Sequence, residues 1–462
     1  MRKLTLLILA AGKGTRLKST LPKVLHQLAG KSFIEYVVEA ASPLNPSATC
    51  VVVGYEAARV ESMLSHLSFQ FAVQEPQLGT GHAVQVAGPF WKPNEGDLLV
   101  LSGDVPLIST QTLQQLLEHH TQSAASVTLL STKLENPAGY GRVIRSRSGT
   151  VERIVEHKDA TDEERRILEI NTGIYCFTIA DLAQIIDELS ADNAQKEYYL
   201  TDCVGLLKKQ NKRLAAVVCE DPSEVSGINS RAELAELEHI VRQKKLKQLM
   251  QDGVTIIDPA STYVEPNVHV GADSVIYPNV FLEKGAIIGS GCQIYPNVRI
   301  SASTIEDEVV VLDSCLISES HVGTKSQVGP FAHLKNHTVV GSQARIGNFV
   351  EINNSWLGDK TKAAHLSYLG DAEIGQDVNV GAGTITCNYD GVSKNKTVIE
   401  DGVFVGSDSQ LIAPVTIHRG AYIAAGSTIQ QDVPEDALAI ARSQQVNKEH
   451  WARKRRESRR KE

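Results

Sequence analysis

The sequence predicts an α/β domain with a mostly parallel sheet, followed by a parallel β-helix. The first observation is that short apolar runs alternate with helical stretches up to about residue 228, which is typical of an α/β layer fold. The second is that aliphatic residues recur at every sixth position past residue 253, which is typical of a β-helix. A chain of 462 residues is long enough for two or three domains.

In the first domain, four apolar runs are predicted to be buried strands and two periodic runs to be helices. The predicted strands are LTLLILA, TCVVVGY, DLLVLSGD and SVTLLST, and the predicted helices are FIEYVVEAAS and TQTLQQLLEHH. Ligands of such folds bind at the carboxyl ends of the strands. The glycine-rich stretch after the first strand and the SGD of the third are therefore expected to contribute to one site.

A charged stretch with helical periodicity follows, NSRAELAELEHIVRQKKLKQLMQ. We interpret it as a connecting helix, and the alternative is an ordinary surface helix of the first domain. The predicted parts are an α/β domain over 1–228, a helical linker over 229–251, and a β-helix domain over 252–462 that ends in a basic tail.

Three long runs carry the six-residue period. Their aliphatic positions are Val264, Val270, Ile276, Leu282, Ile288, Ile294 and Ile300; then Val322, Val328, Leu334, Val340, Ile346 and Ile352; then Ile399, Val405, Leu411, Ile417, Ile423 and Ile429. In a parallel β-helix each hexapeptide makes one flat side, three sides make a coil, and the sixth-position residues stack inside as a continuous core.

The period is lost at three places, between 300 and 322, 352 and 374, and 380 and 399. Insertions in a solenoid become loops on one face, often the binding face. We therefore expect His365 to lie in a loop, near residues of adjacent coils. A lone histidine is more often structural than catalytic, but a histidine in such a loop is a candidate general base, because it accepts a proton near neutral pH.

Net charge and pI limit the classes of partner. The net charge is -8 and the pI is about 6.0, so no basic field over the whole chain points to nucleic acid, and none is expected as a partner. The exception is the tail WARKRRESRRKE. We interpret it as a solvated, disordered end, and the alternative is a contact with nucleic acid or another polyanion.

Cysteine usage and the N-terminus bear on the compartment. Seven scattered cysteines with no CxxC pair suit a reducing cytoplasm and argue against disulfides or a zinc cluster. No apolar run is long enough to span a membrane. The start, MRKLTLLILAAG, has the look of a short signal peptide. We interpret it instead as a buried strand that leads into the glycine loop, and we expect a cytoplasmic protein.

The glycine-rich stretch LAAGKGTRLKSTLPK covers residues 9–23. It is neither a Walker loop, which needs four residues between its first glycine and Gly-Lys-Ser/Thr, nor a GxGxxG motif, because Leu17 stands where the third glycine would fall. From the residues alone it predicts an anion site, with Arg16 and Lys23 supplying positive charge.

This stretch resembles the signature of the sugar-nucleotide pyrophosphorylases. Further matches follow in order: QLGTGHA, SGDVPL, GYGRV, IVEHKDA, EINTGIY and EVSGINSR. With the β-helix and the segment AAHLSYLGDAEIGQDVNVGAGTITCNYDG, nearly the whole chain is similar to the bifunctional bacterial enzymes of UDP-N-acetylglucosamine synthesis. Those enzymes acetylate glucosamine 1-phosphate with acetyl-CoA and then transfer uridylyl from UTP to N-acetylglucosamine 1-phosphate, releasing pyrophosphate. Their product, UDP-N-acetylglucosamine, is a precursor of the bacterial cell wall.

The resemblance implies a Rossmann-like nucleotidyltransferase domain and a set of site residues within it. It assigns nucleotide contacts to Leu9, Ala10, Ala11, Gly12, Lys23, Gln74, Gly79, Thr80, Ser102, Gly103 and Asp104; sugar-phosphate contacts to Gly141, Glu156, Asn171 and Asn229; and Mg²⁺ ligation to Asp104 and Asn229. Arg16 and Lys23 would stabilise the charge that develops on the transferring phosphate.

For the second half, the resemblance implies a left-handed β-helix that assembles as a homotrimer. It makes His365 the general base of acetyl transfer. It assigns the acetyl acceptor to Lys335, Asn353, Tyr368 and Asn379, and acetyl-CoA to Ala382, Asn388, Tyr389, Ser407, Ala425 and Arg442.

One part of this acceptor site departs from the family pattern. The family has an Arg-x-Leu-Arg segment and a lysine shortly after GNFVE, whereas this chain has AHLKN and GNFVEINN. Lys335 keeps a cation, but Asn353 replaces the lysine, so the site has lost a charge and a bidentate fork. Two alternatives therefore stay open: a nucleotidyltransferase whose β-helix only oligomerises, and a nonenzymatic sugar-nucleotide sensor.

Overall fold

The computed structural model describes residues 2–460. The chain divides into two compact units, residues 1–239 and 240–462. The division falls inside helix α9, Arg231–Gln251, which occupies the stretch expected to be a connecting helix.

The first unit is built on a nine-stranded sheet with the order β11-β7-β10-β6-β1-β4-β5. These strands are β1 Leu4–Leu9, β4 Ala48–Val53, β5 Gln70–Val73, β6 Asp97–Ser102, β7 Val127–Lys133, β10 Glu169–Thr178 and β11 Leu214–Cys219. Strand β10 is antiparallel to β6 and β7, and the other pairings along this path, wherever a register is described, are parallel. Strands β8 Arg142–Arg145 and β9 Val151–Val155 extend β10 as an antiparallel pair. The predicted mostly parallel sheet is confirmed.

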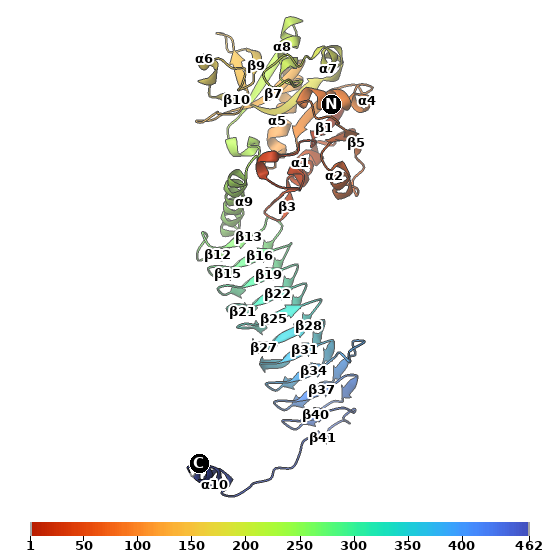
Figure 1. The fold of residues 1–462 in the computed structure, drawn as a ribbon, viewed down its shortest axis with the longest axis vertical. Coiled ribbons are helices and arrows are strands. Elements are labelled where there is room, and N and C mark those ends of the chain that lie inside the picture. Colours follow the sequence, from red (N-terminus) through yellow and green to blue (C-terminus); the bar gives the residue numbers. More distant parts are fainter. Residues whose placement is uncertain (1, 461–462) are drawn as a thin grey trace. The chain divides into compact units, whose positions relative to one another are not determined.

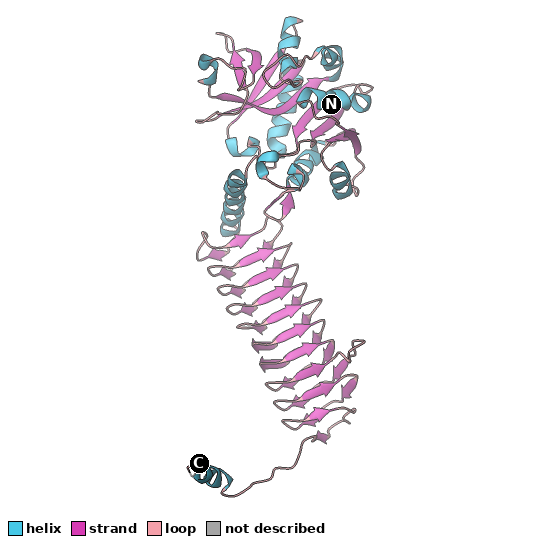
Figure 2. Ribbon diagram, viewed as in Figure 1, coloured by secondary structure: helices cyan, strands magenta, loops and turns pink. Residues whose placement is uncertain are grey.

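Helices lie on both sides of this sheet (Figure 2). They are α1 Phe33–Ala41, α2 Ala57–Met63, α3 Thr80–Val86, α4 Gly88–Trp91, α5 Thr110–Ser123, α6 Asp162–Arg165, α7 Ile179–Ile185 and α8 Asp202–Lys209. Successive residues of β1 join different apolar clusters, with Leu7 in one and Leu6 and Ile8 in the other. Both faces of the strand are therefore buried, which explains its unbroken apolar run.

The second unit is a stack of short parallel strands in three sheets (Figure 1). Sheet I contains β12 Thr255–Ile256, β15 Val275–Ile276, β18 Gln293–Ile294, β21 Val310–Val311, β24 Gln327–Val328, β27 Arg345–Asn348, β30 Lys362–His365, β33 Asn379–Val380, β36 Phe404–Val405, β39 Tyr422–Ile423 and β41 Leu438–Ala439. Sheet II contains β13 Tyr263–Val264, β16 Phe281–Glu283, β19 Arg299–Ser301, β22 Leu316–Ser318, β25 His333–Lys335, β28 Glu351–Asn353, β31 Tyr368–Gly370, β34 Ile385–Cys387, β37 Gln410–Ile412 and β40 Thr428–Ile429.

Sheet III completes the coil with β14 His269–Val270, β17 Ile287–Ile288, β20 Thr304–Ile305, β23 His321–Val322, β26 Val339–Val340, β29 Trp356–Leu357, β32 Ala372–Ile374, β35 Thr397–Ile399 and β38 Val415–Ile417. The sixth-position aliphatics form one continuous core, in which Val270 alone of the predicted set is only partly buried. The predicted hexapeptide β-helix is confirmed.

Two of the three expected loops are not loops. Between 300 and 322, and between 352 and 374, strands continue the stack, and some steps between core residues shorten from six to five, as from Ile352 to Leu357. The prediction that His365 lies in a loop is wrong, because it is the last residue of β30. A corner that is one residue shorter shifts the sequence period without inserting any chain, and residues such as Asp371, with φ of 48°, make these tight corners.

The third break does contain a loop, residues 388–396, between β34 and β35. Asp390 organises it by accepting hydrogen bonds from the backbone N–H of Val392 and of Ser393 and from the Asn395 side chain. After the last coil, the described residues include one more helix, α10, Trp451–Arg459. The basic stretch is therefore not a disordered end. Among the described residues, no helix combines the length and apolarity that crossing a bilayer requires.

Candidate active sites

The carboxyl ends of β1 and β6 open into a cavity of about 420 Å³ in the first unit. Twelve of the residues predicted for nucleotide, metal and phosphate line it: Leu9, Ala10, Ala11, Gly12, Arg16, Lys23, Gln74, Gly79, Thr80, Ser102, Asp104 and Asn229. Gly103 is not in the lining, but its N–H donates to the carbonyl of Leu9 at 2.9 Å. One cavity therefore gathers segments that are more than 200 residues apart in the sequence.

The glycines of this cavity are required by backbone conformation and by close contacts. Gly14 has φ of 65°, and a Cβ there would lie 2.8 Å from Cβ of Lys23. Gly79 has φ of 105°, and a Cβ there would lie 2.7 Å from the carbonyl oxygen of Tyr198. A side chain at either position would displace its neighbour, so both glycines allow close approach.

Two cations and two oxygen ligands converge in the cavity. The Lys23 ammonium pairs with a carboxylate oxygen of Asp104 and donates to Oδ1 of Asn229 at 2.8 Å. Arg16 donates to the same Asn229 oxygen at 2.7 Å. Carboxylate and amide oxygens are the ligands that Mg²⁺ prefers, so the donor set of Asp104 and Asn229 fits this metal, with Lys23 between them.

Three of the four predicted sugar-phosphate contacts, Gly141, Glu156 and Asn171, also lie together. The N–H of Asn171 donates to the carbonyl of Gly141 at 2.9 Å, and a Cβ at Gly141 would lie 3.5 Å from the Glu156 carboxylate. Burial raises the pKa of Glu156, while a hydrogen bond from Thr201 opposes that rise and nearby acidic residues add to it. Glu156 is half-buried, so its carboxylate is partly shielded from water. The free-energy cost of that shielding is smallest when the carboxylate accepts hydrogen bonds, for example from a ligand.

Some residues of this site were not foreseen as functional. Gln77 donates to the carbonyl of Ala11 at 2.7 Å and fixes the glycine loop. Thr201 donates to Glu156 at 3.1 Å, and the backbone of Tyr198 accepts from Gly81 at 2.7 Å. Gln77 is the first residue of the QLGTGHA motif, so the motif could have marked it as functional. Nothing in the sequence indicates that Thr201 pairs with Glu156.

In the second unit, His365 ends β30 and is held by the preceding coil. Its Nδ1 lies 2.7 Å from Oδ1 of Asn348, at the end of β27 and in register with it. An amide oxygen can only accept, so in the neutral ring the proton is on Nδ1 and Nε2 is the acceptor. This tautomer suits a general base, and Asn348, which sequence reasoning missed, selects it.

The predicted acceptor residues form their own contacts on sheet II. Lys335, Asn353 and Gly370 are aligned on neighbouring strands. Lys335 pairs with Glu351 at 2.8 Å. The buried Asn353 accepts from Asn336 at 2.7 Å and lies 3.5 Å from the Tyr368 hydroxyl. The cation that remains is therefore already paired with a carboxylate. Asn379 lies on sheet I instead, in register with Lys362 of the same strand as His365.

Four of the predicted acetyl-CoA residues share one edge of the β-helix. Ala382, Ser407, Ala425 and Arg442 each follow a strand of sheet I: β33, β36, β39 and β41. His365 ends β30, the strand before them in the stack. Neighbouring strands are about 4.8 Å apart, so this edge runs about 19 Å from His365 to Arg442 and suits an extended ligand.

Asn388 and Tyr389, the other two, begin the loop over residues 388–396. Asn388 donates to Oδ2 of Asp371 at 2.5 Å, and Asn354 donates to Oδ1 of the same carboxylate at 2.5 Å. Asp371 thus ties this loop to two coils, a role that the sequence did not reveal. A separate cavity of about 450 Å³ lies beside the loop, and its lining includes Trp356, Asp371 and Lys394 but not His365.

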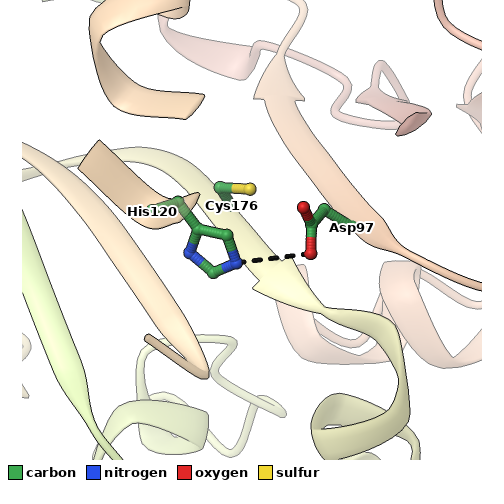
Figure 3. A group of neighbouring side chains, drawn as sticks. All are labelled: Asp97, His120 and Cys176. Atoms are coloured by element: carbon green, nitrogen blue, oxygen red, sulfur yellow. Dashed lines mark ion pairs between the residues drawn. The ribbon is translucent and has the colours of Figure 1, made fainter. Parts of the chain in front are cut away.

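A further group, Asp97, His120 and Cys176, has ligand atoms within 4.8 Å of one another (Figure 3). We interpret it as a buried polar network rather than a metal site. His120 Nδ1 is 2.9 Å from the Thr128 hydroxyl, its Nε2 is 3.3 Å from the Thr178 hydroxyl, and Arg2 lies 3.4 Å from Asp97. Asp97 begins β6, so the group is at the opposite end of that strand from the cavity.

Comparisons with known proteins agree with the folds of both halves of the chain. A model of MobA-like NTP transferase domains matches residues 6–174, one of GMPPB C-terminal domains matches 259–358, and one of bacterial transferase hexapeptides (six repeats) matches 396–431. The chain is therefore a nucleotidyltransferase domain joined to a hexapeptide-repeat transferase domain of the left-handed β-helix class.

Curated relatives cover both domains at once. The bifunctional protein GlmU of Trichlorobacter lovleyi is 49% identical over 98% of each chain. That of Carboxydothermus hydrogenoformans is 49% identical over 97% of this chain and 99% of its own, and that of Trichormus variabilis is 48% identical over 98% and 99%. The chain belongs to the bifunctional GlmU family.

Proposed function

We propose that this chain, as a bifunctional member of its family, makes UDP-N-acetylglucosamine through two separate sites. The acetyltransferase site acetylates glucosamine 1-phosphate with acetyl-CoA, and the uridylyltransferase site joins N-acetylglucosamine 1-phosphate to UTP. The observation that carries the proposal is the coverage of both halves by bifunctional relatives over 98% of the chain. It favours two activities over a single nucleotidyltransferase with an inert β-helix.

In uridylyl transfer, a phosphate oxygen of the sugar phosphate attacks the α-phosphorus of UTP in line. A new P–O bond forms, the bond to the β-phosphate breaks, and pyrophosphate leaves. The nucleophile is already an anion, so the site needs positioning and charge neutralisation rather than a strong base. Arg16 and Lys23 supply positive charge, and Gln74, Gly79 and Thr80 hold the uracil.

Asp104 and Asn229 are the groups that would hold Mg²⁺. When bound, this ion supplies further neutralisation of triphosphate charge. The support is the chemistry of the two oxygen ligands and their convergence on Lys23. Gly141, Glu156 and Asn171 orient N-acetylglucosamine, with the half-buried Glu156 as an acceptor for a sugar hydroxyl or amide.

In acetyl transfer, the amine of glucosamine 1-phosphate attacks the thioester carbonyl of acetyl-CoA. The C–N bond forms, the C–S bond breaks, and Nε2 of His365 takes the proton that the amine loses. Coenzyme A lies along the edge that contains Ala382, Ser407, Ala425 and Arg442, with Asn388 and Tyr389 near the acetyl group. Lys335, Asn353, Tyr368 and Asn379 contact the acceptor.

The β-helix also makes the protein a homotrimer. Three large apolar residues, Phe331, Phe349 and Leu366, are each more than half exposed on successive coils, and the two phenylalanine rings stack at 5.2 Å. Exposed apolar stripes of this kind mark protein interfaces.

All seven cysteines are unpaired, which supports a cytoplasmic enzyme.

A substrate panel tests this proposal. Pyrophosphate release from UTP should require N-acetylglucosamine 1-phosphate, and thiol release from acetyl-CoA should require glucosamine 1-phosphate. Pyrophosphate release without acetylation would support the alternative of a nucleotidyltransferase whose β-helix only oligomerises. Nucleotide binding without uridylyl or acetyl transfer would support the nonenzymatic sensor.

A further inference from the structure

Strand β10 is irregular between Asn171, a residue of the sugar site, and the buried Tyr175. Along β7, Asn171 is in register with Ser131 and Tyr175 with Leu129. Four steps along β10 therefore match two steps along β7, so β10 contains two extra residues here, in the form of a bulge. In a regular strand, residues four apart are separated by about 13 Å. Their side chains stand across the strand and do not meet.

The bulge brings these two side chains into contact. Nδ2 of Asn171 donates to the Tyr175 hydroxyl at 2.7 Å, and the N–H of Gly173 donates to Oδ1 of the same amide at 3.4 Å. Because a backbone N–H can only donate, the amide oxygen faces Gly173 and the amide nitrogen faces Tyr175. Within the described chain, this leaves one N–H of the amide and one lone pair of its oxygen for a ligand.

The same bulge borders the nucleotide cavity. Gly173 has φ of 80°, and a Cβ there would lie 3.1 Å from the hydroxyl oxygen of Ser102, which lines that cavity. Thr172 fixes the middle of the bulge by donating to the carbonyl of Leu130 at 2.8 Å. Bulges next to active sites re-aim a side chain, and the side chain re-aimed here is that of Asn171.

Tyr175 is suited to hold this arrangement. It is only 2% exposed, and its ring packs beside that of Phe177 with the centroids 5.5 Å apart. Burial raises the pKa of Tyr175, and the charge of Glu156 adds to that rise. The phenol therefore stays neutral and acts as a hydrogen-bonding group rather than as a base. The packed ring fixes the position of its oxygen.

We propose that Tyr175 is a positioning residue for uridylyl transfer: its buried hydroxyl closes the bulge of β10 and fixes the Asn171 amide in the orientation that binds N-acetylglucosamine 1-phosphate. The inference rests on the proposed function, which assigns the sugar to the site that contains Asn171. Tyr175 acts through Asn171 and does not itself touch the sugar. A hydroxyl that only satisfied a buried polar group would affect the stability of the protein and not its affinity for the sugar phosphate.

Tyr175→Phe removes the hydroxyl and keeps the ring. In the pyrophosphate-release assay, KM for N-acetylglucosamine 1-phosphate should rise about three- to tenfold, the scale of one hydrogen bond between neutral groups. KM for UTP should stay the same, and kcat should change little. Tyr36→Phe is the matched control, because it removes a hydroxyl that donates to the carbonyl of Leu28 at 3.0 Å, and neither residue is in the cavity lining. It should leave both KM values unchanged.

A double-mutant cycle tests whether the hydroxyl acts through the amide. Asn171→Ala should raise KM for the sugar phosphate more than Tyr175→Phe does, and adding Tyr175→Phe to Asn171→Ala should have no further effect. Melting curves ensure that every variant is assayed well below its Tm. Additive effects in the double variant, or an equal rise in KM for UTP, would overturn the proposal.

The wild type separates this inference from the proposed function. Normal wild-type turnover with an unchanged sugar-phosphate KM in Tyr175→Phe would overturn this inference alone. A wild type that releases no pyrophosphate from UTP and N-acetylglucosamine 1-phosphate would overturn the proposed function and this inference together.

Discussion

The two proposed sites of this chain are built in opposite ways. In the first unit, loops from distant parts of the sequence surround a cavity, and Arg16, Lys23, Asp104 and Asn229 already contact one another. In the second unit, the residues lie singly along an open edge, about one per coil, from His365 to Arg442. The first arrangement concentrates charge, and the second distributes contacts along a line.

The difference matches the two reactions. Phosphoryl chemistry places several negative charges within a few ångströms, so cations and oxygen ligands must converge on one point. Acetyl transfer brings fewer charges together at the reacting atoms and uses a long donor, which suits an extended edge with one well-placed base. Losing one group should therefore have a larger effect in the convergent site than along the edge.

The largest effect is expected for Asp104→Asn. The neutral amide holds a metal poorly beside a triphosphate and leaves Lys23 without its carboxylate partner. Uridylyl transfer should fall by about 10²–10³-fold, the scale of losing one electrostatic stabiliser. Acetyl transfer by the same preparation should be unchanged. Pyrophosphate release at the wild-type rate would show that Asp104 is not part of the site.

The next effect is expected for His365→Ala. Removing the base should lower acetyl transfer about 100-fold, within the range for general base catalysis, and leave uridylyl transfer unchanged. Asn348→Leu should give a smaller loss, because the imidazole remains but its tautomer is no longer selected. If His365→Ala acetylates normally, the base lies elsewhere on the edge.

Elements with a regular period could be predicted from the sequence. Strand β1 is buried on both faces and is therefore a continuous apolar run, and the hexad places one aliphatic residue inside each flat side. What the period could not show is whether a break is a loop or a shorter corner. His365 was therefore expected in a loop but ends a strand, because shortening a corner by one residue changes the phase as an insertion does.

The side-chain partners could not be predicted either. Asn348 lies seventeen residues before His365, and Asn354 lies seventeen before Asp371. These pairs depend on which residues the register of adjacent coils brings together, and the local sequence does not encode that pairing. Lys335 and Glu351 are another such pair: they lie on adjacent strands, offset by two residues in the register.

A smaller effect is expected for Asn353→Lys, which tests the departure from the family pattern in the acceptor site on sheet II. Lys335 is engaged by Glu351, so the acceptor phosphate has lost a free cation. A new charge-assisted hydrogen bond should lower KM for glucosamine 1-phosphate about tenfold, since each such bond contributes about 1.5–3 kcal/mol. KM for acetyl-CoA should stay the same.

Gln293→Lys adds the same charge to an exposed position several coils away and serves as the control. It should leave both KM values unchanged. An unchanged acceptor KM in Asn353→Lys would mean that other groups, such as His333, already complete the phosphate contact. If neither the wild type nor the variant acetylates glucosamine 1-phosphate, the β-helix only oligomerises and the chain is a nucleotidyltransferase alone.

The smallest effect is expected for Glu156→Gln, in the convergent site of the first unit. The quantity measured is the thermal stability of the protein. Burial raises the pKa of Glu156 above the 4.5 of a free side chain, so the folded state binds its proton more tightly than the unfolded state does. Stability is then lost as the pH rises from the unfolded pKa through the folded pKa, because the buried carboxylate must ionise. Glutamine has the same shape but never ionises, so it removes this cost. Tm should therefore rise at pH 7.5, by about 2–4 °C for each 1 kcal/mol of ionisation cost that is removed from a domain of this size. The gain should shrink toward zero near pH 4, where both states are protonated in the wild type.

Glu152→Gln on the exposed side of β9 should show no such gain. A gain that persists at pH 4 would point to packing rather than ionisation, and no gain at pH 7.5 would mean that the site already stabilises the carboxylate.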